Sequence, residues 1–132
     1  AAVAAHTAAQ TVASRKASQI ALEAFTAALP ELLPPVKLEQ LLRGWEPARA
    51  LFFADELGGM AAAPAFAAHS GPAAILTGPE GGFDDAERAA IRALPQTRAI
   101  TLGPRVLRGE TAALSATALW MGLAGDWARD PE

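Results

Sequence analysis

The sequence predicts an α/β domain with a mainly parallel sheet flanked by helices. Three short apolar runs alternate along the chain with segments of helical spacing, which is the order expected of strand, helix, strand, helix, strand, helix. The second and third apolar runs each end in a glycine-rich turn. With 132 residues, 52% of them hydrophobic, the chain is long enough for one core and short for two. We therefore expect residues 1–132 to form a single domain.

Composition narrows the class of protein further. The chain has no cysteine, so we expect neither disulfides nor thiolate metal ligands. The reducing cytoplasm is the expected compartment. No apolar run approaches the roughly 20 residues that a membrane-spanning helix needs, so we expect no membrane contact. The formal net charge of −3 argues against a large cationic surface for nucleic acid on this chain alone.

Two helices separated by an extended linker are expected within residues 17–44. Residues 17–29 show three- and four-residue apolar spacing, with Ser18 as a cap and Pro30 as a stop. Pro34 and Pro35 then predict an extended linker. Residues 36–42 follow as a short helix that ends at Gly44.

The central part alternates between strands and helices. Residues 48–56, ARALFFADE, predict a buried strand whose carboxyl end opens into a loop at two acids. A loop and a short helix broken around Pro64 should come next. Residues 72–78, PAAILTG, predict a second buried strand. Residues 84–94 predict a helix, since Asp84 and Asp85 suit the positive end of its dipole.

The last third completes the pattern. Residues 97–103, TRAITLG, predict a third strand, and residues 110–125 predict a long final helix. That helix carries Ala112, Leu119 and Leu123 among many small residues, which would allow close packing against a partner. A homodimer through this helix is therefore expected.

Two glycine-rich turns are the candidate functional segments. The first, TGPEGGF at 77–83, follows a strand, and its glycines at 78, 81 and 82 are expected to reach positive φ and to approach a ligand closely. Ligands of open α/β sheets lie outside the carboxyl ends of the strands. The turn lacks the lysine and hydroxyl of a Walker loop, and the chain has no Rossmann fingerprint.

The second turn, LGPRVLRGETA at 102–112, is the more specific. It places Arg105 and Arg108 three residues apart and Glu110 at the start of a helix. In this order and spacing, the two turns resemble those of the catalytic domain of bacterial 16S ribosomal RNA uracil-N(3) methyltransferases, which belong to the SPOUT class. The resemblance runs from ALFFADE at 50–56 through the final helix.

The resemblance implies a SPOUT-type domain with a carboxyl-terminal trefoil knot, acting on 16S ribosomal RNA of the small subunit. It implies S-adenosylmethionine as cofactor and methylation of a uridine at ring N(3). Members also carry an amino-terminal RNA-binding β-barrel, which we expect this chain not to contain. They usually read EAAEQ before the proline linker, whereas here EAFTAALPEL begins at Glu23. The acid and amide pair is missing there.

By the same resemblance, the cofactor lies in a pocket made partly by the loop after ALFFADE. The residues that it implies for cofactor binding come from the two turns: Thr77, Gly78, Pro79, Glu80, Gly81, Gly82, Leu102, Gly103, Val106 and Leu107.

The charged residues of the second turn are the candidates for catalysis and substrate binding. Arg108 is expected to stabilise the developing uracil anion or to hold a phosphate, and Arg105 is a further substrate-binding candidate. Glu110 either orients Arg108 or accepts a proton. A structural alternative for Glu110 is that it only favours the helix start electrostatically.

Other conspicuous residues have mainly structural interpretations, and no metal site is expected. Asp84 and Asp85 suit a helix start better than a metal. The remaining candidates are expected to lie at the surface, in loops, in the core or at a dimer contact: His6, His69, Arg15, Lys16, Trp45, Trp120 and Trp127.

Two other functions remain open at this point. One is a different SPOUT enzyme, such as a transfer RNA 2′-O or guanine-N(1) methyltransferase; LRGETA favours the uracil family. The other is a catalytically silent domain that only dimerises or binds a nucleotide.

Overall fold

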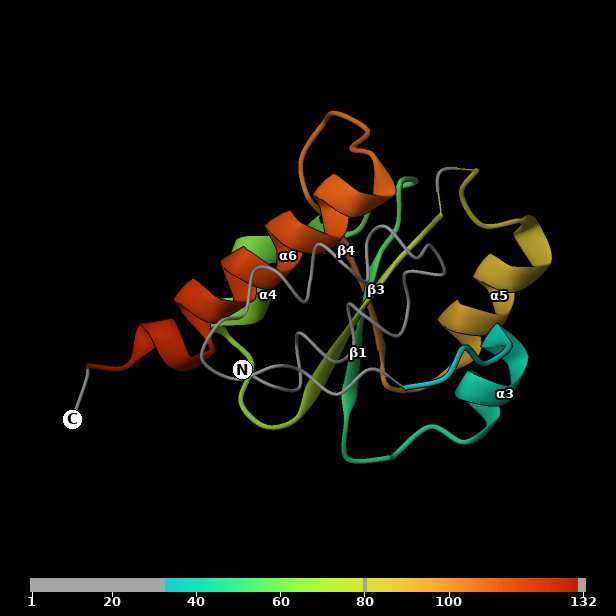
Figure 1. The fold of residues 1–132 in the computed structure, drawn as a ribbon, viewed down its shortest axis with the longest axis horizontal. Helices are drawn as coiled ribbons and strands as arrows, with labels where there is room; N and C mark the ends of the chain where they lie inside the picture. The colour runs from blue at the N-terminus through green and yellow to red at the C-terminus, as the bar shows by residue number, and fades with distance from the viewer. Residues whose placement is uncertain (1–32, 80, 131–132) are drawn as a thin grey trace.

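A computed structural model describes residues 33–79 and 81–130 of the chain (Figure 1). The helix expected at 17–29 lies outside these residues, as do His6, Arg15, Lys16 and Glu80.

The fold is built on a four-stranded, wholly parallel sheet. Its strands are β1 (Ala50–Ala54), β2 (Met60–Ala61), β3 (Ala73–Thr77) and β4 (Thr97–Thr101), in the order β2-β4-β1-β3. The predicted α/β class with a mainly parallel sheet is therefore confirmed. Sequence did not predict β2, because two residues carry no readable period; they become a strand only by pairing with Ile100 and Thr101 of β4.

Helices cover both faces of the sheet (Figure 1). On one face lie α3 (Leu38–Arg43) and α5 (Asp85–Ala93). On the other lie α4 (Ala62–Ala67) and α6 (Gly109–Leu123), and a single 3₁₀ turn at Asp126–Ala128 follows α6. This three-layer arrangement explains why β1 and β3 read as continuous apolar runs, since both of their faces are covered.

Pro64 does not break the helix around it, which corrects the expectation from sequence. It is the third residue of α4, within the first turn. An amide hydrogen there has no partner inside the helix, so the missing N–H of proline costs nothing. The chain can therefore be helical from Ala62, directly after β2.

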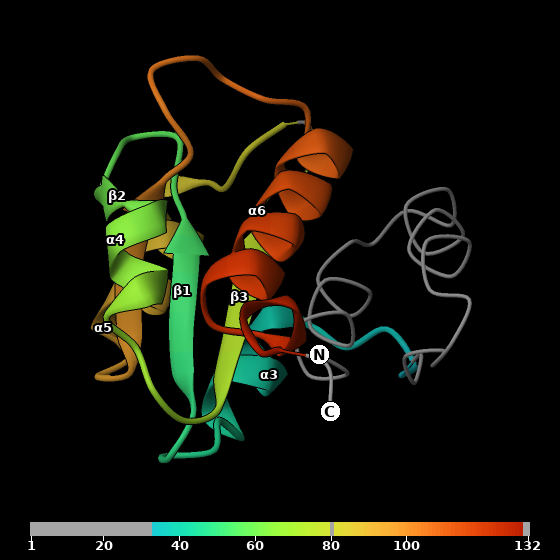
Figure 2. The same cartoon turned by 90° about the vertical axis from the view of Figure 1, so that its left-hand side faces the viewer.

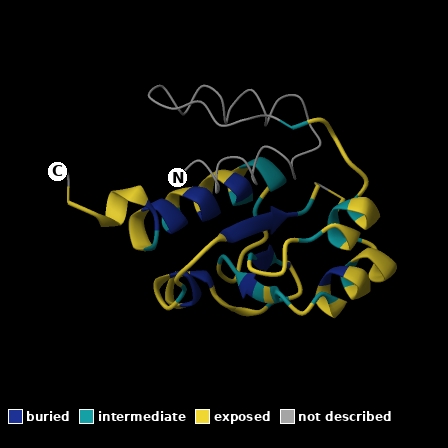
Figure 3. Ribbon diagram, turned by 90° about the horizontal axis from the view of Figure 1, so that it is seen from below, coloured by how far each residue is buried: buried dark blue, intermediate teal, exposed yellow. Residues whose placement is uncertain are grey.

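Alternate side chains of β1 divide the core into two clusters. Phe52 points toward α4 and α6, where its ring meets the rings of Phe66 at 5.0 Å and Trp120 at 5.9 Å between centroids. Leu51 and Phe53 pack on the opposite face with Ile91 of α5. Figure 3 shows the buried residues concentrated in the strands and on the inner faces of the helices. This period of two is the ordinary consequence of a pleated strand.

Helix α6 uses its small residues against its own domain. Its buried positions are Ala113, Ala116, Thr117, Trp120 and Met121. The close packing expected of this helix is thus realised within the chain, while Leu123 stays exposed. Trp127, at 66% exposed, is not a core residue of the described part of the chain, in contrast to the buried Trp120.

Among residues 33–79 and 81–130, no helix is long and apolar enough to cross a membrane.

Candidate ligand-binding site

The loops that leave β1, β3 and β4 meet at one end of the sheet (Figure 2). After β1 the chain forms β2 at the far edge beyond β4, crosses by way of α4 to β3 on the opposite side of β1, and then returns through α5 to β4, between β2 and β1. Such a reversal of direction opens a crevice at the carboxyl ends of the strands, which is where open α/β sheets bind ligands.

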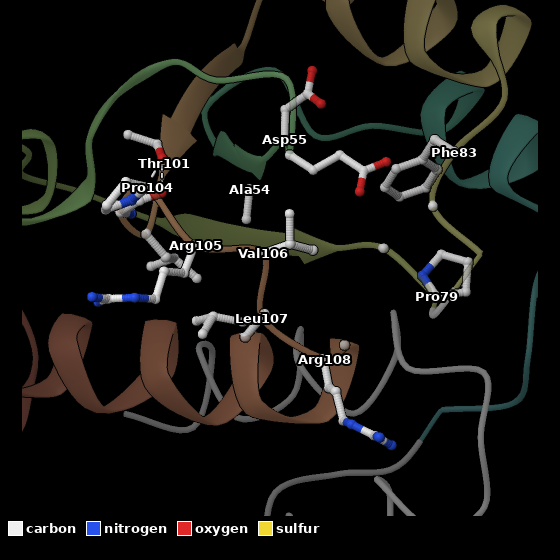
Figure 4. Close-up of a pocket in the computed structure, with 17 residues that line it drawn as sticks. Ala54, Asp55, Pro79, Phe83, Thr101, Pro104, Arg105, Val106, Leu107 and Arg108 are labelled. Carbon is white, nitrogen blue, oxygen red and sulfur yellow. Dashed lines mark hydrogen bonds between the residues drawn. The ribbon is translucent and has the colours of Figure 1, made fainter.

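A cavity of about 390 Å³ occupies this crevice (Figure 4). Small-molecule sites are typically about 300–1,000 Å³, so the space suits a ligand of cofactor size. The three loops and the start of α6 form the wall: Ala54, Asp55, Glu56, Gly78, Pro79, Gly82, Phe83, Thr101, Leu102, Gly103, Pro104, Arg105, Val106, Leu107, Arg108, Gly109 and Ala112.

Most of the residues expected from sequence lie in this wall. Those that line the cavity are Gly78, Pro79, Gly82, Leu102, Gly103, Arg105, Val106, Leu107 and Arg108. Thr77, Gly81 and Glu110 are not in the lining. Thr77 is buried at the end of β3, and its hydroxyl has no hydrogen-bond partner in the described part of the chain. The two turns predicted from sequence thus line one cavity together.

The glycines of the first turn act through two different constraints. Gly82 has a φ of +72°, and a Cβ there would lie 2.6 Å from Oε1 of Glu56. Gly78 and Gly81 do not have positive φ, contrary to expectation. A Cβ at Gly78 would lie 3.0 Å from the Phe83 ring. Gly78 is therefore required by close packing, and Gly82 by backbone conformation as well.

The two turns touch at Gly109. A Cβ at this position would lie 2.7 Å from the carbonyl oxygen of Gly78. Only a residue without a side chain allows the start of α6 to approach the first turn this closely. The contact closes the cavity where the two segments meet.

The second turn supplies an apolar wall. Val106 is 78% exposed although it is apolar, and Leu102 and Leu107 are half-buried beside it. Figure 4 shows Val106 near the middle of the lining, facing the loops after β1 and β3. Exposed apolar surface in a cavity of this size is suited to a flat ring such as a nucleobase.

The arginines and Glu110 are placed separately. The side chains of Arg105 and Arg108 point away from each other (Figure 4), so the structure does not bring their guanidinium groups together. Arg108 is the N-cap residue of α6, without a side-chain capping bond. Glu110 lies half-buried in the first turn of that helix, where the helix dipole favours a carboxylate.

Sequence reasoning did not single out Asp55, Glu56 and Phe83, which also line the cavity. The Asp55 side chain has no exposed area and makes ion pairs with Arg88 at 3.2 Å and Arg92 at 2.6 Å. Burial raises the pKa of Asp55. The backbone N–H of Leu57 and the two guanidinium groups outweigh that effect and hold the pKa below its usual value. The sequence signal that could have identified Asp55 and Glu56 as site residues is their position directly after a buried strand.

Two structural interpretations from sequence hold. Asp84 caps α5: its Oδ1 accepts the N–H of Glu87 at 2.7 Å, and its own N–H donates to Oε2 of Glu87 at 3.0 Å. His69 lies half-buried after α4, packed on Phe52 and Trp120. Within the described ranges, no group of three or more His, Cys, Asp or Glu residues could hold a metal ion.

A parallel sheet with a cavity of this size at the carboxyl ends of its strands is typical of α/β domains that bind small molecules. Residues 4–121 match the family model described as RNA methyltransferase domain. The match covers most of the chain, which therefore belongs to this family.

Individual relatives agree with that assignment. Ribosomal RNA small subunit methyltransferase E of Rickettsia conorii is 46% identical over 44 residues, which are 33% of this chain and 18% of that protein. Among solved structures, a Legionella pneumophila methyltransferase in complex with SAM has a TM-score of 0.65 at 23% identity. The SAM-bound ribosomal RNA small subunit methyltransferase E of Neisseria gonorrhoeae has a TM-score of 0.63 at 20% identity.

These structural matches each cover 92% of this chain, which spans about 60% of either solved chain. At this level of identity they establish the fold alone, and it agrees with the parallel sheet flanked by helices that the sequence predicts. The trefoil knot stays a prediction.

Proposed function

We propose that this chain is the catalytic domain of an S-adenosylmethionine-dependent enzyme that methylates a uridine at ring N(3) in 16S ribosomal RNA of the small subunit. The observation that carries the proposal is that the two glycine-rich turns together line one cavity, with Gly109 packed against Gly78. Membership of the RNA methyltransferase family and the identity to a small-subunit methyltransferase support it.

The cavity suits the proposed cofactor. The backbone of Gly78, Pro79 and Gly82 would hold the polar parts of the nucleoside. The side chains of Leu102, Val106 and Leu107 would cover the adenine with apolar surface. Thr77, Glu80, Gly81 and Gly103 complete the set of cofactor-binding residues that we propose from the resemblance. When bound, S-adenosylmethionine supplies an electrophilic methyl group.

The charged residues of the chain would bind the uridine and assist its methylation. Transfer to N(3) requires that this nitrogen lose its proton, which leaves negative charge on the ring. We assign Arg108 to stabilise that charge and Glu110 to orient Arg108 or accept the proton. Arg105, on another part of the same wall, would contact the RNA.

The remaining partners are also proposals. With a net charge of −3, the domain alone offers little general attraction for RNA, so another domain or subunit must help to hold the substrate. A homodimer with a composite site, working in the cytoplasm on the small ribosomal subunit, is the assembly that we propose.

The direct test is methylation of small ribosomal particles that lack the modification. Particles are incubated with the protein and methyl-labelled S-adenosylmethionine, and the digested nucleosides are separated by chromatography and mass. We expect 3-methyluridine. A 2′-O-methylated nucleoside or 1-methylguanosine would instead assign another specificity, and would overturn the N(3) proposal.

Binding must be measured alongside activity. Calorimetric titration with S-adenosylmethionine should show saturable heat for the protein. Saturable binding without any methylation of particles would favour a domain that only binds a nucleotide, and the absence of heat would overturn the cofactor assignment as well.

A further inference from the structure

Glu56 is the exposed carboxylate of the cavity. Two acidic side chains belong to the described lining, Asp55 and Glu56. Asp55 has no exposed side-chain area and is paired with two arginines, so it cannot meet a ligand. The Glu56 side chain is 46% exposed. Among the described lining residues, Glu56 alone can present negative charge to the space.

The position of Glu56 is set from two sides. Its Oε1 lies 3.6 Å from Nη2 of Arg88, whose side chain is mostly buried because it also binds Asp55. The same Oε1 lies against the backbone of Gly82, where a Cβ would approach within 2.6 Å. The carboxylate therefore lies between Arg88 of α5 and the first glycine turn, while 46% of its side chain stays exposed.

The charges around the cavity otherwise favour anions. Arg105 and Arg108 belong to the lining, and Arg88 and Arg92 lie behind it. Asp55 offsets part of the charge of the latter pair. A ligand with positive charge would meet unfavourable electrostatics in most of this space, and burial would increase the cost. Contact with the Glu56 carboxylate would offset part of this electrostatic cost for a positively charged group.

We propose that Glu56 is the counter-charge for the cationic part of the ligand in this cavity. This inference rests on the proposed function, because S-adenosylmethionine carries two positive groups, the sulfonium and the ammonium, against one carboxylate. Glu56 would bind one of these cations, while Arg88 acts as a positioning residue that holds the carboxylate in place.

The test compares three ligands on the wild-type chain and on Glu56→Gln. S-adenosylmethionine has both cations, S-adenosylhomocysteine has only the ammonium, and 5′-methylthioadenosine has neither. Calorimetry should show that Glu56→Gln weakens S-adenosylmethionine binding roughly tenfold to a hundredfold, the range of a charge-assisted hydrogen bond. Binding of 5′-methylthioadenosine should change less than about twofold on the same physical basis.

S-adenosylhomocysteine, which has the ammonium but no sulfonium, shows which of the two cations Glu56 binds. If S-adenosylhomocysteine loses affinity as S-adenosylmethionine does, Glu56 binds the ammonium; if only S-adenosylmethionine is affected, it binds the sulfonium. Either result supports the proposal. Equal loss for all three ligands, or no loss for any, would overturn it.

Two controls separate this role from folding. Glu39→Gln removes an exposed carboxylate of α3, whose only described ion pair is with Arg43, and should leave all three affinities unchanged. Glu56→Asp keeps the charge on a shorter stem and should restore part of the affinity. Added salt should weaken S-adenosylmethionine binding less in Glu56→Gln than in wild type. If wild type itself binds none of the ligands, the proposed function fails, whereas normal binding by Glu56→Gln defeats this inference alone.

Discussion

Gly109, the first residue of α6, lies so close to Gly78 that an added Cβ would be 2.7 Å from the Gly78 carbonyl oxygen. These residues are 31 positions apart in sequence and belong to the two glycine-rich turns. Their contact joins the loop after β3 to the start of the last helix, and the cavity lies between these segments.

Gly109→Ala should therefore separate the turns. We expect a loss of about 1–3 kcal/mol in the free energy of unfolding, typical of an overpacked site, and weaker cofactor binding. Gly122→Ala in the same helix is the matched control, because a Cβ there meets nothing within 4 Å. It should stabilise the protein by up to about 1 kcal/mol. Urea unfolding measures both variants; equal stability of the two would show that the contact is unimportant.

Gly82 should be more sensitive than Gly81. At Gly82 an alanine meets both positive φ and the Glu56 carboxylate, whereas a Cβ at Gly81 meets nothing within 4 Å. Gly82→Ala should weaken S-adenosylmethionine binding about tenfold because the added Cβ displaces the Glu56 carboxylate, while positive φ costs about 1–2 kcal/mol of folding stability. Gly81→Ala should weaken binding less than Gly82→Ala, because its Cβ meets no protein atom within 4 Å. Calorimetry on the folded variants decides, and the reverse order would contradict the structure.

Asp55 should anchor the loop after β1 through its buried ion pairs. Asp55→Asn removes the charge but leaves Arg88 and Arg92 in place. Breaking a fully buried pair typically costs about 3–5 kcal/mol, and the loss here should be smaller because the Arg92 side chain is 45% exposed. Urea unfolding at neutral pH should show this loss. The exposed pair of α3 provides the control: Glu39→Gln should change stability by less than about 1 kcal/mol. A small effect of Asp55→Asn would indicate that the loop is held by other contacts.

The same carboxylate predicts a pH dependence. The pKa of Asp55 is lower in the folded protein than the unfolded value of about 3.9, so the folded state resists protonation. Its contribution to stability is fully present above the unfolded pKa and is lost as the pH falls through the folded pKa. Between neutral pH and acid, wild type should therefore lose more stability than Asp55→Asn. Parallel curves for the two proteins would argue against this linkage.

Arg108→Ala should affect the reaction more than cofactor binding. A guanidinium beside a sulfonium would repel it, so we expect S-adenosylmethionine affinity to stay within a few fold. Methylation should fall by on the order of a hundredfold or more, as when one preorganised charge partner is removed. Lysine should restore activity only partly, because it keeps the charge but loses the planar fork. Arg43→Ala in α3 is the control and should be fully active. A normal rate for Arg108→Ala would move the catalytic assignment to Arg105.

A homodimer is the expected assembly, and light scattering at micromolar concentration tests it. The structure shows that the alanines at 113 and 116 already pack within the domain. A contact through α6 would therefore have to use its outer, exposed residues, which include Leu114 and Leu123. Leu114→Arg should weaken the dimer without unfolding the chain, since this side chain contributes little to the core. A wild-type monomer would remove the argument for a composite substrate site.

The sequence by itself determined the class of the fold and the segments that form the site. Three apolar runs separated by helical spacing were sufficient for a parallel α/β sheet, because strands covered on both faces must be apolar throughout. The spacing of TGPEGGF and LGPRVLRGETA was enough to identify the family. These are local patterns, because each depends only on residues that are close together in the sequence.

The tertiary structure decided what depends on distant residues meeting. Strand β2 exists only through its pairing with β4, and Pro64 is harmless only because α4 begins at Ala62. The constraint on Gly109 comes from a carbonyl 31 residues away. Asp55 and Glu56 are adjacent in sequence, yet one is buried by two arginines of α5 while the other faces the cavity. The burial of a side chain and its ion-pair partners depend on packing across the sheet, so they cannot be predicted from a local sequence pattern.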